Sequence, residues 1–348
     1  MAQTVVVGLG RSGQGAARLL QATGHPVSVI DSGQGEQLEK KAEGLRQQGV
    51  EVQLQAPLAI DSFRPWLDQL QRVVISPGLP WDHPTLDDLR QRGVAVDGEM
   101  AVAWDALKHI PWVGITGTNG KTTVTHLLSH VLCQAGLAAP MGGNMGVSAA
   151  EMALNLQQEH TTAPDWLVME LSSYQIEAAK RIRPRIGIWT TLTPDHLERH
   201  GTVEAYRAIK HGLLERSDHA IFNADDPDLR QQRQSWTGGT WVSAESAQPD
   251  GHPADLWING EGWVCDRSQP LFPAEALAMP GAHNRQNLLL VTAAARQIGL
   301  SPASIEAGLR SFPGVPHRLE PVGRIGNAQV FNDSKATNYD AAAVGLKA

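Results

Sequence analysis

The sequence predicts an α/β protein built on parallel sheets, with two nucleotide-binding domains and the beginning of a third α/β domain. Three observations support this prediction. Short apolar strands alternate with helical segments along most of the 348 residues, a pattern that favours parallel sheets covered by helices. Two strands run directly into glycine-rich loops, at residues 8–13 and 114–122, and each loop opens a helix. A chain of this length also exceeds one ordinary core, so about two domains and a remainder are expected.

Composition and charge exclude several classes of protein. Acidic residues outnumber basic ones by 36 to 29, which gives a net charge of −7, and there is no basic block, so a nucleic-acid surface is not expected. Cys133 and Cys265 are far apart in the sequence, which favours a reducing cytoplasm over a disulfide framework. The N-terminus enters a strand at once, without a signal-peptide pattern. The longest apolar stretch, residues 288–295, is too short to span a bilayer. We therefore expect a cytoplasmic monomer that does not enter a membrane.

Residues 1–108 have the pattern of a Rossmann-like domain. The spacing Gly8-x-Gly10-x-x-Gly13 follows a strand, and Asp31 stands at the end of the next strand. This combination satisfies the dinucleotide fingerprint. The strands of the domain are predicted at residues 4–8, 27–30, 72–76 and 94–97, and the first helix is predicted to end at about residue 23.

The first loop alone leaves three interpretations open. It fits an NAD-dependent oxidoreductase, and it fits equally a protein that holds the pyrophosphate of a UDP-sugar in the same loop. In the third interpretation, the glycines serve only tight packing of strand against helix. The spacing of the glycines does not separate these three.

The second loop is more informative. The run Val113-Gly-Ile-Thr-Gly-Thr-Asn-Gly-Lys-Thr-Thr123 overlaps a strand at residues 112–116 and precedes a helix to about residue 135. Backbone N–H groups of such a loop converge on phosphate oxygens, Lys121 would neutralise the β- and γ-phosphates, and the Thr122 hydroxyl would ligate Mg²⁺. Ile115 stands where the strict phosphate-loop pattern has its first glycine. The competing interpretation is a glycine-rich turn with an incidental lysine.

Residues 109–316 continue as a central parallel-sheet domain of the P-loop ATPase type. Glu170 ends one strand, and Asp195 and His196 follow another. Because such sheets bind ligands at the carboxyl ends of their strands, these groups are expected to meet Lys121 at a Mg²⁺–nucleotide site. Lys210 lies on a helix, where a solvated side chain is the ordinary expectation. Further strands are predicted at residues 166–170, 186–190 and 220–223, a loop at 246–255, a hairpin at 257–264, a helix at 284–298 and a linker at 312–317.

Residues 317–348 have the pattern of the first strand, 328–332, and the first helix, 339–346, of a third α/β domain. Between them, Asn332-Asp-Ser-Lys-Ala-Thr-Asn338 offers an acid, a base and hydroxyls for another phosphate or acyl contact. One strand and one helix cannot bury a core. We therefore expect a truncated domain whose strand lacks sheet partners and exposes an edge.

Taken together, these motifs resemble the Mur ligase family over the whole chain. Within the family, the N-terminal Gly-Leu-Gly-x-Ser-Gly paired with Asn-Asp-Ser-Lys-Ala-Thr-Asn is nearest to the ligases that add D-glutamate. The residues that carry the resemblance are Gly8-Leu-Gly-Arg-Ser-Gly13, Ser76-Pro-Gly78, Gly117-Thr-Asn-Gly-Lys-Thr122, Gly142-Gly-Asn-Met-Gly146, Glu170-Leu-Ser-Ser173, Asp195-His196, Tyr206-Arg-Ala-Ile-Lys210, Gly281-Ala-His-Asn284, Pro316-His-Arg318 and Asn332–Asn338.

The resemblance implies an enzyme of peptidoglycan precursor synthesis, and so of cell-wall growth, cell shape and division. Such an enzyme uses ATP and Mg²⁺, with two ions expected, to join D-glutamate to UDP-N-acetylmuramoyl-L-alanine through an acyl-phosphate intermediate. It also implies that Lys210 is carbamylated. The alternatives are another Mur-type or folylpolyglutamate-type ligase, an NAD-binding oxidoreductase, or a nucleotide-binding module without activity. Because the family's third domain binds D-glutamate, this chain is expected to bind nucleotides without full turnover.

The resemblance further implies a role for each matching residue, with Asp195 orienting His196. The implied catalytic residues are Lys121, His196, Lys210, Arg318, Asp333 and Lys335, and the implied metal ligands are Thr122, Glu170, His196 and Lys210. ATP would contact Gly117, Thr118, Asn119, Gly120, Lys121, Thr122, Thr123, Asn284 and Asn287. The UDP-linked substrate would contact Gly10, Arg11, Ser12, Gly13, Asp31, Ser32, Ser76, Pro77, Gly78, Asn144 and Ser172.

Overall fold

The computed structural model describes residues 2–158, 162–236, 238–336, 342–343 and 345–346. The predicted α/β class with parallel sheets is confirmed. By its contacts the chain divides into two compact units. Unit 1 comprises residues 1–110, 142–163 and 171–182, and unit 2 comprises residues 111–141, 164–170 and 183–348. Of the helices in the described residues, none is long and apolar enough to cross a membrane.

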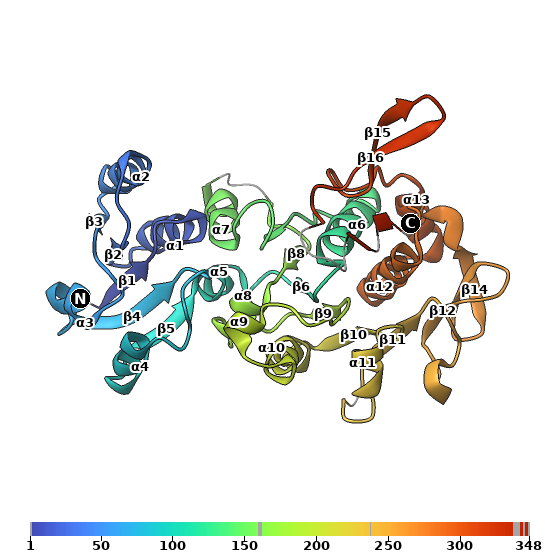
Figure 1. The fold of residues 1–348 in the computed structure, drawn as a ribbon, viewed down its shortest axis with the longest axis horizontal. Coiled ribbons are helices and arrows are strands. Elements are labelled where there is room, and N and C mark those ends of the chain that lie inside the picture. The colour runs from blue at the N-terminus through green and yellow to red at the C-terminus, as the bar shows by residue number, and fades with distance from the viewer. Residues whose placement is uncertain (1, 159–161, 237, 337–341, 344, 347–348) are drawn as a thin grey trace. The chain divides into compact units, whose positions relative to one another are not determined.

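Unit 1 is built on a five-stranded parallel sheet in the order β3-β2-β1-β4-β5 (Figure 1). β1 (Gln3–Val7) lies in the middle because its valines are buried on both faces. The strand order reverses between β1 and β4, so the carboxyl end of β1 opens onto the crevice where such sheets bind ligands. The loop of residues 8–13 starts at that point. The other strands are β2 (Val27–Ile30), β3 (Glu51–Gln53), β4 (Leu70–Ile75) and β5 (Ala95–Gly98).

Helices cover both faces of this sheet and close its core. Phe63, Trp66 and Leu86 are buried among the strand residues of one face. On the other, α1 packs against α5 and α7, so the segment that contains α7 belongs to this unit although it follows β6 in the chain. The helices are α1 (Arg11–Ala22), α2 (Glu36–Arg46), α3 (Ile60–Phe63), η1 (Arg64–Trp66), α4 (Pro84–Gln91), α5 (Glu99–Leu107), α7 (Ala149–Gln158) and α8 (Ser173–Glu177).

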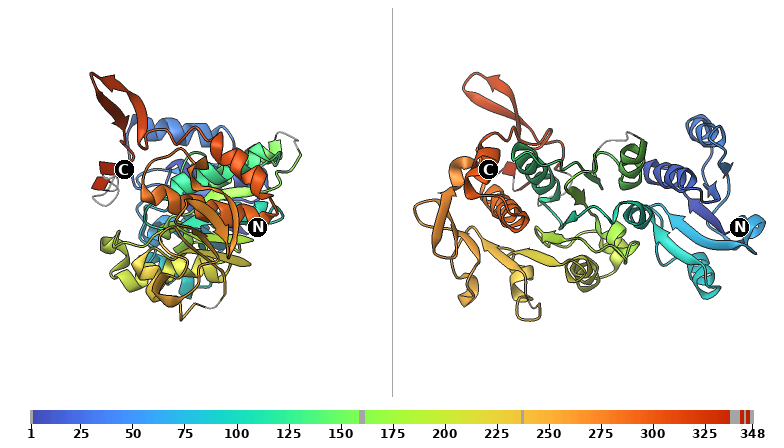
Figure 2. Two further views of the ribbon diagram at one scale, coloured as in Figure 1. Left: turned by 90° about the vertical axis from the view of Figure 1, so that its right-hand side faces the viewer. Right: turned by 180° about the vertical axis from the view of Figure 1, so that it is seen from behind.

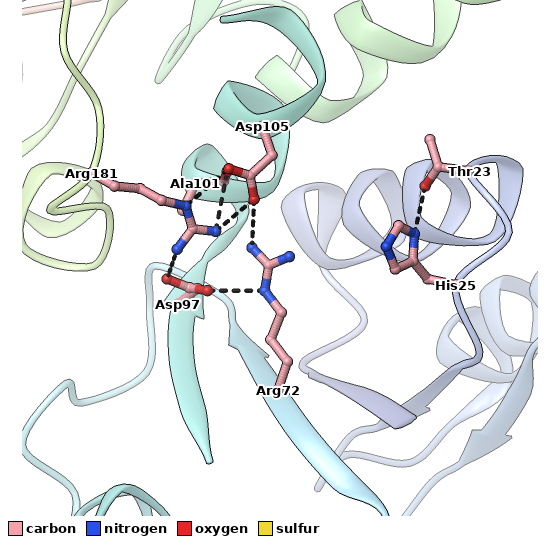
Figure 3. A network of polar contacts seen from close by, with 7 residues as sticks. All are labelled: Thr23, His25, Arg72, Asp97, Ala101, Asp105 and Arg181. Carbon is pink, nitrogen blue, oxygen red and sulfur yellow. Dashed lines mark hydrogen bonds and ion pairs between the residues drawn. The ribbon is translucent and has the colours of Figure 1, made fainter. Parts of the chain in front are cut away.

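An ion network ties the end of the α8 segment to the sheet of unit 1 (Figure 3). Arg181 binds Asp97 at the end of β5, and it binds Asp105 of α5 at 2.8 Å. Arg72 of β4 contacts the same two carboxylates at 2.9 and 3.2 Å. The Asp97 side chain is only 13% exposed. Two guanidinium groups therefore compensate a half-buried pair of carboxylates.

This network predicts that Arg181→Ala destabilises unit 1. Removing one guanidinium leaves Asp97 enclosed with a single cationic partner, so we expect the free energy of unfolding to fall by about 1–2 kcal/mol. Urea unfolding measures the change. Arg185→Ala is the matched control, because Arg185 pairs with Asp218 where the two side chains are 66% and 56% exposed, and its loss should cost under about 0.5 kcal/mol. Equal losses in both variants would contradict the prediction.

Unit 2 is built on a larger sheet in the order β14-β13-β12-β11-β10-β9-β6-β8-β7. From β12 to β8 the neighbouring strands are parallel, whereas β12, β13 and β14 pair in antiparallel fashion. The predicted hairpin at residues 257–264 is therefore confirmed as β12 and β13. The strands are β6 (Trp112–Thr116), β7 (Met141–Gly143), β8 (Leu167–Glu170), β9 (Ile186–Trp189), β10 (His219–Asn223), β11 (Thr240–Ser243), β12 (Leu256–Ile258), β13 (Trp263–Asp266) and β14 (Gln269–Pro273).

The helices of this unit lie on the two faces of the sheet (Figures 1 and 2). α6 and α12 pack together and against the sheet, and their apolar residues form most of the larger core. α10 contacts β9 and β10 from the opposite face. The helices are α6 (Lys121–Gln134), α9 (Leu197–His200), α10 (Val203–Glu215), α11 (Pro227–Gln231), η2 (Pro249–Gly251), η3 (Ala274–Ala276), α12 (Ala282–Ile298) and α13 (Pro302–Arg310).

The C-terminal segment corrects one expectation. The predicted strand at 328–332 exists as β16 (Ala328–Asn332), but it is not without a partner, because β15 (Glu320–Ile325) pairs with it in antiparallel fashion. Sequence reasoning missed β15 because Pro321 and Gly323 interrupt its pattern. The hairpin leaves Ile325 76% exposed. The predicted helix at 339–346 lies largely outside the described residues, as do Thr337 and Asn338.

Candidate active site

The turn that carries Lys121 has the shape of a phosphate loop. β6 ends at Thr116 and α6 begins at Lys121. Between them, Gly117 and Gly120 take φ values of +148° and +85°. A Cβ atom at Gly117 would lie 1.9 Å from the Thr190 Oγ1 atom, so only glycine fits at this position. The backbone can therefore turn sharply from β6 into α6, and the N-terminus of such a helix is suited to bind an anion.

The end of the neighbouring strand β9 holds this loop in place. The Thr118 N–H donates to the Thr191 carbonyl at 2.8 Å, and the Asn119 N–H donates to the Thr191 hydroxyl at 3.0 Å. The Thr118 hydroxyl donates to the carbonyl of Thr193 at 3.1 Å. The loop is therefore fixed by contacts within the protein, which is the preorganisation that electrostatic catalysis requires.

Lys121 folds back over the same loop. Its Nζ donates to the carbonyls of Gly117 and Thr118 at 3.0 and 2.8 Å. Removal from water lowers the pKa of Lys121, the carboxylates of Glu170 and Asp195 act against this decrease, and Arg318 lowers the pKa further. Two cationic and two anionic side chains therefore influence one another at the start of α6, as expected where phosphates and metal ions bind.

Thr122 and Glu170 provide adjacent oxygen atoms. The Thr122 hydroxyl donates to the Glu170 carboxylate at 2.9 Å. Glu170 is 2% exposed and ends β8, which pairs directly with β6. A hydroxyl and a carboxylate at this separation, with Glu170 as the charged member, fit the oxygen ligands that Mg²⁺ prefers.

Lys210 is buried, which is the opposite of the solvated side chain expected for an isolated helical lysine. It is 1% exposed. Its Nζ donates to the Gly117 carbonyl at 2.9 Å and to the Thr116 hydroxyl at 3.3 Å, and it lies 4.6 Å from the centre of the Tyr206 ring. Burial lowers the pKa of Lys210 well below its ordinary value, and Lys121 adds to this effect. Burial therefore favours the neutral form of this amine, which lies against the phosphate loop.

His196 follows β9 on the loop that begins at residue 190. It takes the left-handed φ value of +54° and its side chain is 44% exposed. Its Nε2 lies 3.6 Å from the Asp195 carboxylate, which is longer than a hydrogen bond. Asp195 instead accepts the backbone N–H of His196 at 2.9 Å. The orienting role expected of Asp195 thus stays a prediction.

Asn284 and Asn287 face the phosphate loop from α12. Both are buried, and the Asn287 amide donates to the Asn284 carbonyl oxygen at 3.1 Å. The Asn284 amide donates in turn to the Pro280 carbonyl at 2.6 Å. A Cβ atom at Gly120 would lie 3.0 Å from the Asn287 Oδ1 atom. Asn287 therefore lies beside the loop, and Asn284 is connected to the loop through Asn287.

In unit 1, the glycine loop is braced by two of the predicted residues. The Asp31 carboxylate accepts the N–H groups of Leu9 and Gly33 at 2.6 and 2.7 Å, one on each oxygen. A Cβ atom at Gly8 would lie 2.5 Å from the Ser76 hydroxyl, so Ser76 packs directly against the loop. An acid at this position in an NAD site binds the ribose; here each Asp31 oxygen also accepts one backbone N–H, so the carboxylate fixes the conformation of the glycine loop.

Comparison with known proteins decides the family. The Mur ligase middle domain matches residues 115–295, and the Mur ligase MurD-like N-terminal domain matches residues 2–98. The chain belongs to the Mur ligase family. It is 99% identical over its full length to a protein of Parasynechococcus marenigrum (strain WH8102) named UDP-N-acetylmuramoylalanine--D-glutamate ligase, of which it covers 75%. A protein of the same name from Synechococcus sp. (strain CC9605) is 66% identical and is covered to 76%.

Solved structures of Mur ligases share the fold. The UDP-N-acetylmuramate-alanine ligase MurC from Thermotoga maritima aligns with a TM-score of 0.59 at 21% identity, over 99% of this chain and 76% of that one. The UDP-N-acetylmuramate:L-alanyl-gamma-D-glutamyl-meso-diaminopimelate ligase from Neisseria meningitides aligns with a TM-score of 0.60 at 20% identity, over 90% of this chain and 99% of that one. Mur ligases are ATP-dependent and use Mg²⁺.

The predicted Mur ligase residues separate into two sets in the structure. Unit 2 brings Lys121, Thr122, Glu170 and Lys210 together around the phosphate loop. Ser172 and Asn144 belong to unit 1 by their contacts, and the Ser172 hydroxyl accepts the Gln175 N–H as the N-terminal cap of α8. Unit 1 also holds the glycine-loop residues Gly10, Arg11, Ser12, Gly13, Asp31 and Ser32 with Ser76, Pro77 and Gly78.

The predicted residues of the C-terminal segment act on the phosphate-loop helix and its surroundings by their charge. Arg318 lowers the pKa of Lys121, and Lys335 lowers the pKa of His126 on α6, after the larger effect of burial in each case. Asp333 accepts the Leu319 N–H at 3.2 Å. Among the described residues, the Arg318 Nε–H has no hydrogen-bond partner, which leaves it available to an anion.

Sequence reasoning missed two side chains that support the Mur ligase site. Asp226 accepts the Leu192 N–H at 2.7 Å and also caps α11 through the Leu229 N–H at 3.0 Å. Asn223 donates to the Thr190 carbonyl at 2.9 Å. Together they fix the segment that holds the phosphate loop and leads to His196. An aspartate directly before a proline at a helix start was the available signal.

Proposed function

We propose that this chain forms the UDP-sugar-binding and ATP-binding parts of a ligase that joins D-glutamate to UDP-N-acetylmuramoyl-L-alanine in peptidoglycan precursor synthesis. The main support for this proposal is the cluster around residues 117–120, which brings together Lys121, the Thr122–Glu170 pair and buried Lys210. A dehydrogenase has no use for this second nucleotide loop. The names of the 99% and 66% identical relatives support the same reaction. We place the protein in the cytoplasm, where its substrates are made, and propose that it acts as a monomer.

We assign one substrate to each domain. Residues 1–108 would bind the UDP-linked substrate, 109–316 would bind ATP, and 317–348 would begin a domain for D-glutamate. The family models at residues 2–98 and 115–295 support the first two assignments. By contact, the segments 142–163 and 171–182 also belong to unit 1, so residues such as Asn144 would contribute to the UDP-sugar side.

The proposed reaction explains why cationic residues surround the loop. The alanine carboxylate is a poor electrophile until an oxygen of it attacks the γ-phosphorus of ATP, which forms an acyl phosphate and releases ADP. Lys121 and Arg318 would stabilise the charge that spreads over the phosphoryl oxygens. The amine of D-glutamate then attacks the acyl carbon, the C–O bond to phosphate breaks, and the amine loses a proton. His196, Asp333 and Lys335 would surround this centre, and the adenine nucleotide would contact Asn284 and Asn287.

The residues present fit Mg²⁺ and a modified lysine. Thr122 and Glu170 supply adjacent oxygens, and His196 would supply a nitrogen. Among the described residues there is no group of three or more His, Cys, Asp or Glu side chains placed to hold a metal, so the proposed set depends on Thr122 and on Lys210. In its neutral form, which burial favours, the Lys210 amine would add to CO₂ with loss of a proton and become an anionic carbamate. Bound Mg²⁺, with two ions proposed, would neutralise phosphate charge.

Calorimetry on this chain tests the assignment. We expect UDP-N-acetylmuramoyl-L-alanine and Mg²⁺–ATP to bind with micromolar affinity, and NADH to give no heat of binding. The reason is that residues 2–98 match the Mur ligase MurD-like N-terminal domain, and the relatives that share it are named for a UDP-linked substrate. Tight NADH binding without a response to the UDP-sugar would refute the ligase function and favour the oxidoreductase.

A further inference from the structure

Glu99 is a buried carboxylate that the proposed reaction does not use. It is the first residue of α5 in unit 1 and is 1% exposed. Its Oε1 accepts the N–H of Ala150 at 2.6 Å. Among the described residues, its Oε2 has no hydrogen-bond partner. Burying a carboxylate with one unpaired oxygen destabilises the fold. A functional reason is therefore needed to explain why Glu99 is kept at this position.

The partner of Glu99 connects it to a predicted substrate loop. Ala150 lies in the first turn of α7, which begins three residues after the motif Gly142-Gly-Asn-Met-Gly146. The first N–H groups of a helix need acceptors, and a carboxylate is the strongest that a protein supplies. Glu99 therefore fixes the point at which the loop enters α7.

Helix α1 holds the same loop from its other side. The Arg11 guanidinium donates to the Gly146 carbonyl at 2.9 Å. A Cβ atom at Gly15 would lie 2.8 Å from the Ser148 hydroxyl, so α1 packs closely on the segment between loop and helix. Gly143 and Val147 are joined by a backbone hydrogen bond of 3.0 Å. The loop that carries Asn144 is thus attached to the glycine loop of unit 1 and to Glu99.

We propose that Glu99 is a positioning residue, which holds the loop of residues 142–148 so that Asn144 can contact the UDP-linked substrate. The inference rests on the proposed function, because the substrate is the one named there. If residue 99 served only to stabilise the junction of α5 and α7, glutamine would be the better choice, because its amide oxygen can accept the same N–H without a buried charge. The presence of glutamate therefore favours a role in binding.

The charge on Glu99 makes the effect dependent on pH. Burial raises the pKa of Glu99 to about 7, against the opposing effects of the Ala150 N–H, the Ser148 hydroxyl and Arg11. The other charged groups on the elements packed around α5 are Arg18 and Glu151, which pair at 3.6 Å, and the network of Asp97 with Arg72 and Arg181 described above. The range from pH 6 to 8.5 spans the Glu99 pKa of about 7. In that range the loop is held by a carboxylate at high pH and by a neutral acid at low pH.

Stability and binding should therefore respond in opposite directions. A carboxyl whose folded pKa is raised contributes stability that is fully present below its ordinary pKa of 4.5, and this contribution is lost as the pH rises from there to about 7. Glu99→Gln should raise Tm by a few degrees at pH 8.5 and by clearly less at pH 5.5, where only part of the penalty has developed. The same variant should bind UDP-N-acetylmuramoyl-L-alanine about fivefold to tenfold more weakly at pH 8.5, because the charged acceptor of the Ala150 N–H is gone.

The experiment is calorimetry of this chain with UDP-N-acetylmuramoyl-L-alanine and, separately, Mg²⁺–ATP at pH 6 and pH 8.5. We expect the wild-type affinity for the UDP-sugar to fall at pH 6, the Glu99→Gln affinity to be the same at both, and ATP binding to be unaffected. Glu151→Gln is the matched control, since it removes the same charge from the first turn of α7 at a half-exposed position. It should bind both ligands as the wild type does.

Three results would overturn the inference. They are unchanged UDP-sugar affinity in Glu99→Gln, an equal loss of affinity for ATP, or an equal loss in Glu151→Gln. If Glu99→Gln does not fold, the pH dependence of the wild-type protein still tests the inference. A wild-type affinity for the UDP-sugar that is the same from pH 6 to pH 8.5 would exclude the proposed role of Glu99. The proposed function fails separately, when the wild type binds no UDP-N-acetylmuramoyl-L-alanine at either pH.

Discussion

In a chain extended to the full length of its 99% identical relative, Lys210→Ala is expected to lower D-glutamate-dependent phosphate release by about two to three orders of magnitude. Lys210 is buried against the phosphate loop, and burial lowers its pKa, which favours the neutral amine that adds to CO₂. Alanine removes the carbamate and leaves a space near Thr116 and Gly117. A small carboxylate such as formate or acetate should enter that space and restore part of the activity.

The control separates this role from a general loss of structure. Lys40→Ala makes the same substitution at an exposed helical position, where Lys40 pairs with Glu36 at 2.7 Å, and it should retain full activity. Thermal unfolding of Lys210→Ala should still be cooperative, with a lower Tm because a buried side chain is lost. Full activity in Lys210→Ala without added carboxylate would show that Lys210 has no catalytic role.

The second large effect is expected from chain length. The 348-residue chain should bind UDP-N-acetylmuramoyl-L-alanine, and should bind ATP more weakly than the extended chain, but should release no phosphate in response to D-glutamate. The chain covers 75% of its 99% identical relative, and we propose that the D-glutamate site lies beyond residue 316. Without that site the two reactants are not held together, and positioning supplies much of the rate in such reactions.

A phosphate-release assay on the two chains side by side measures this difference. The control for folding is calorimetry with the UDP-sugar, which should give the same affinity in both chains because residues 1–108 are common to them. Equal D-glutamate-dependent turnover in the two chains would refute the proposal that the third domain carries the amino-acid site.

Structural features that depend only on residues close in the sequence could be predicted. β2 and β6 begin and end where the apolar runs at 27–30 and 112–116 begin and end, and α6 starts at the lysine that closes the glycine turn. Elements with interrupted or polar patterns could not. β15 contains Pro321 and Gly323, and pairing with β16 supplies the hydrogen bonds that hold it as a strand.

The sequence by itself determined which residue types follow each strand, and therefore the two glycine loops, the motifs and the family. Only the tertiary structure decided that Lys210 is buried with a lowered pKa, that both oxygens of Asp31 accept backbone N–H groups, and that Glu99 accepts the Ala150 N–H beside the loop of residues 142–148. The physical reason is that loop conformation follows from local sterics, whereas burial, desolvation and pKa depend on groups that folding brings together from distant parts of the chain. Lys210 and Gly117 are 93 residues apart in sequence and share one hydrogen bond.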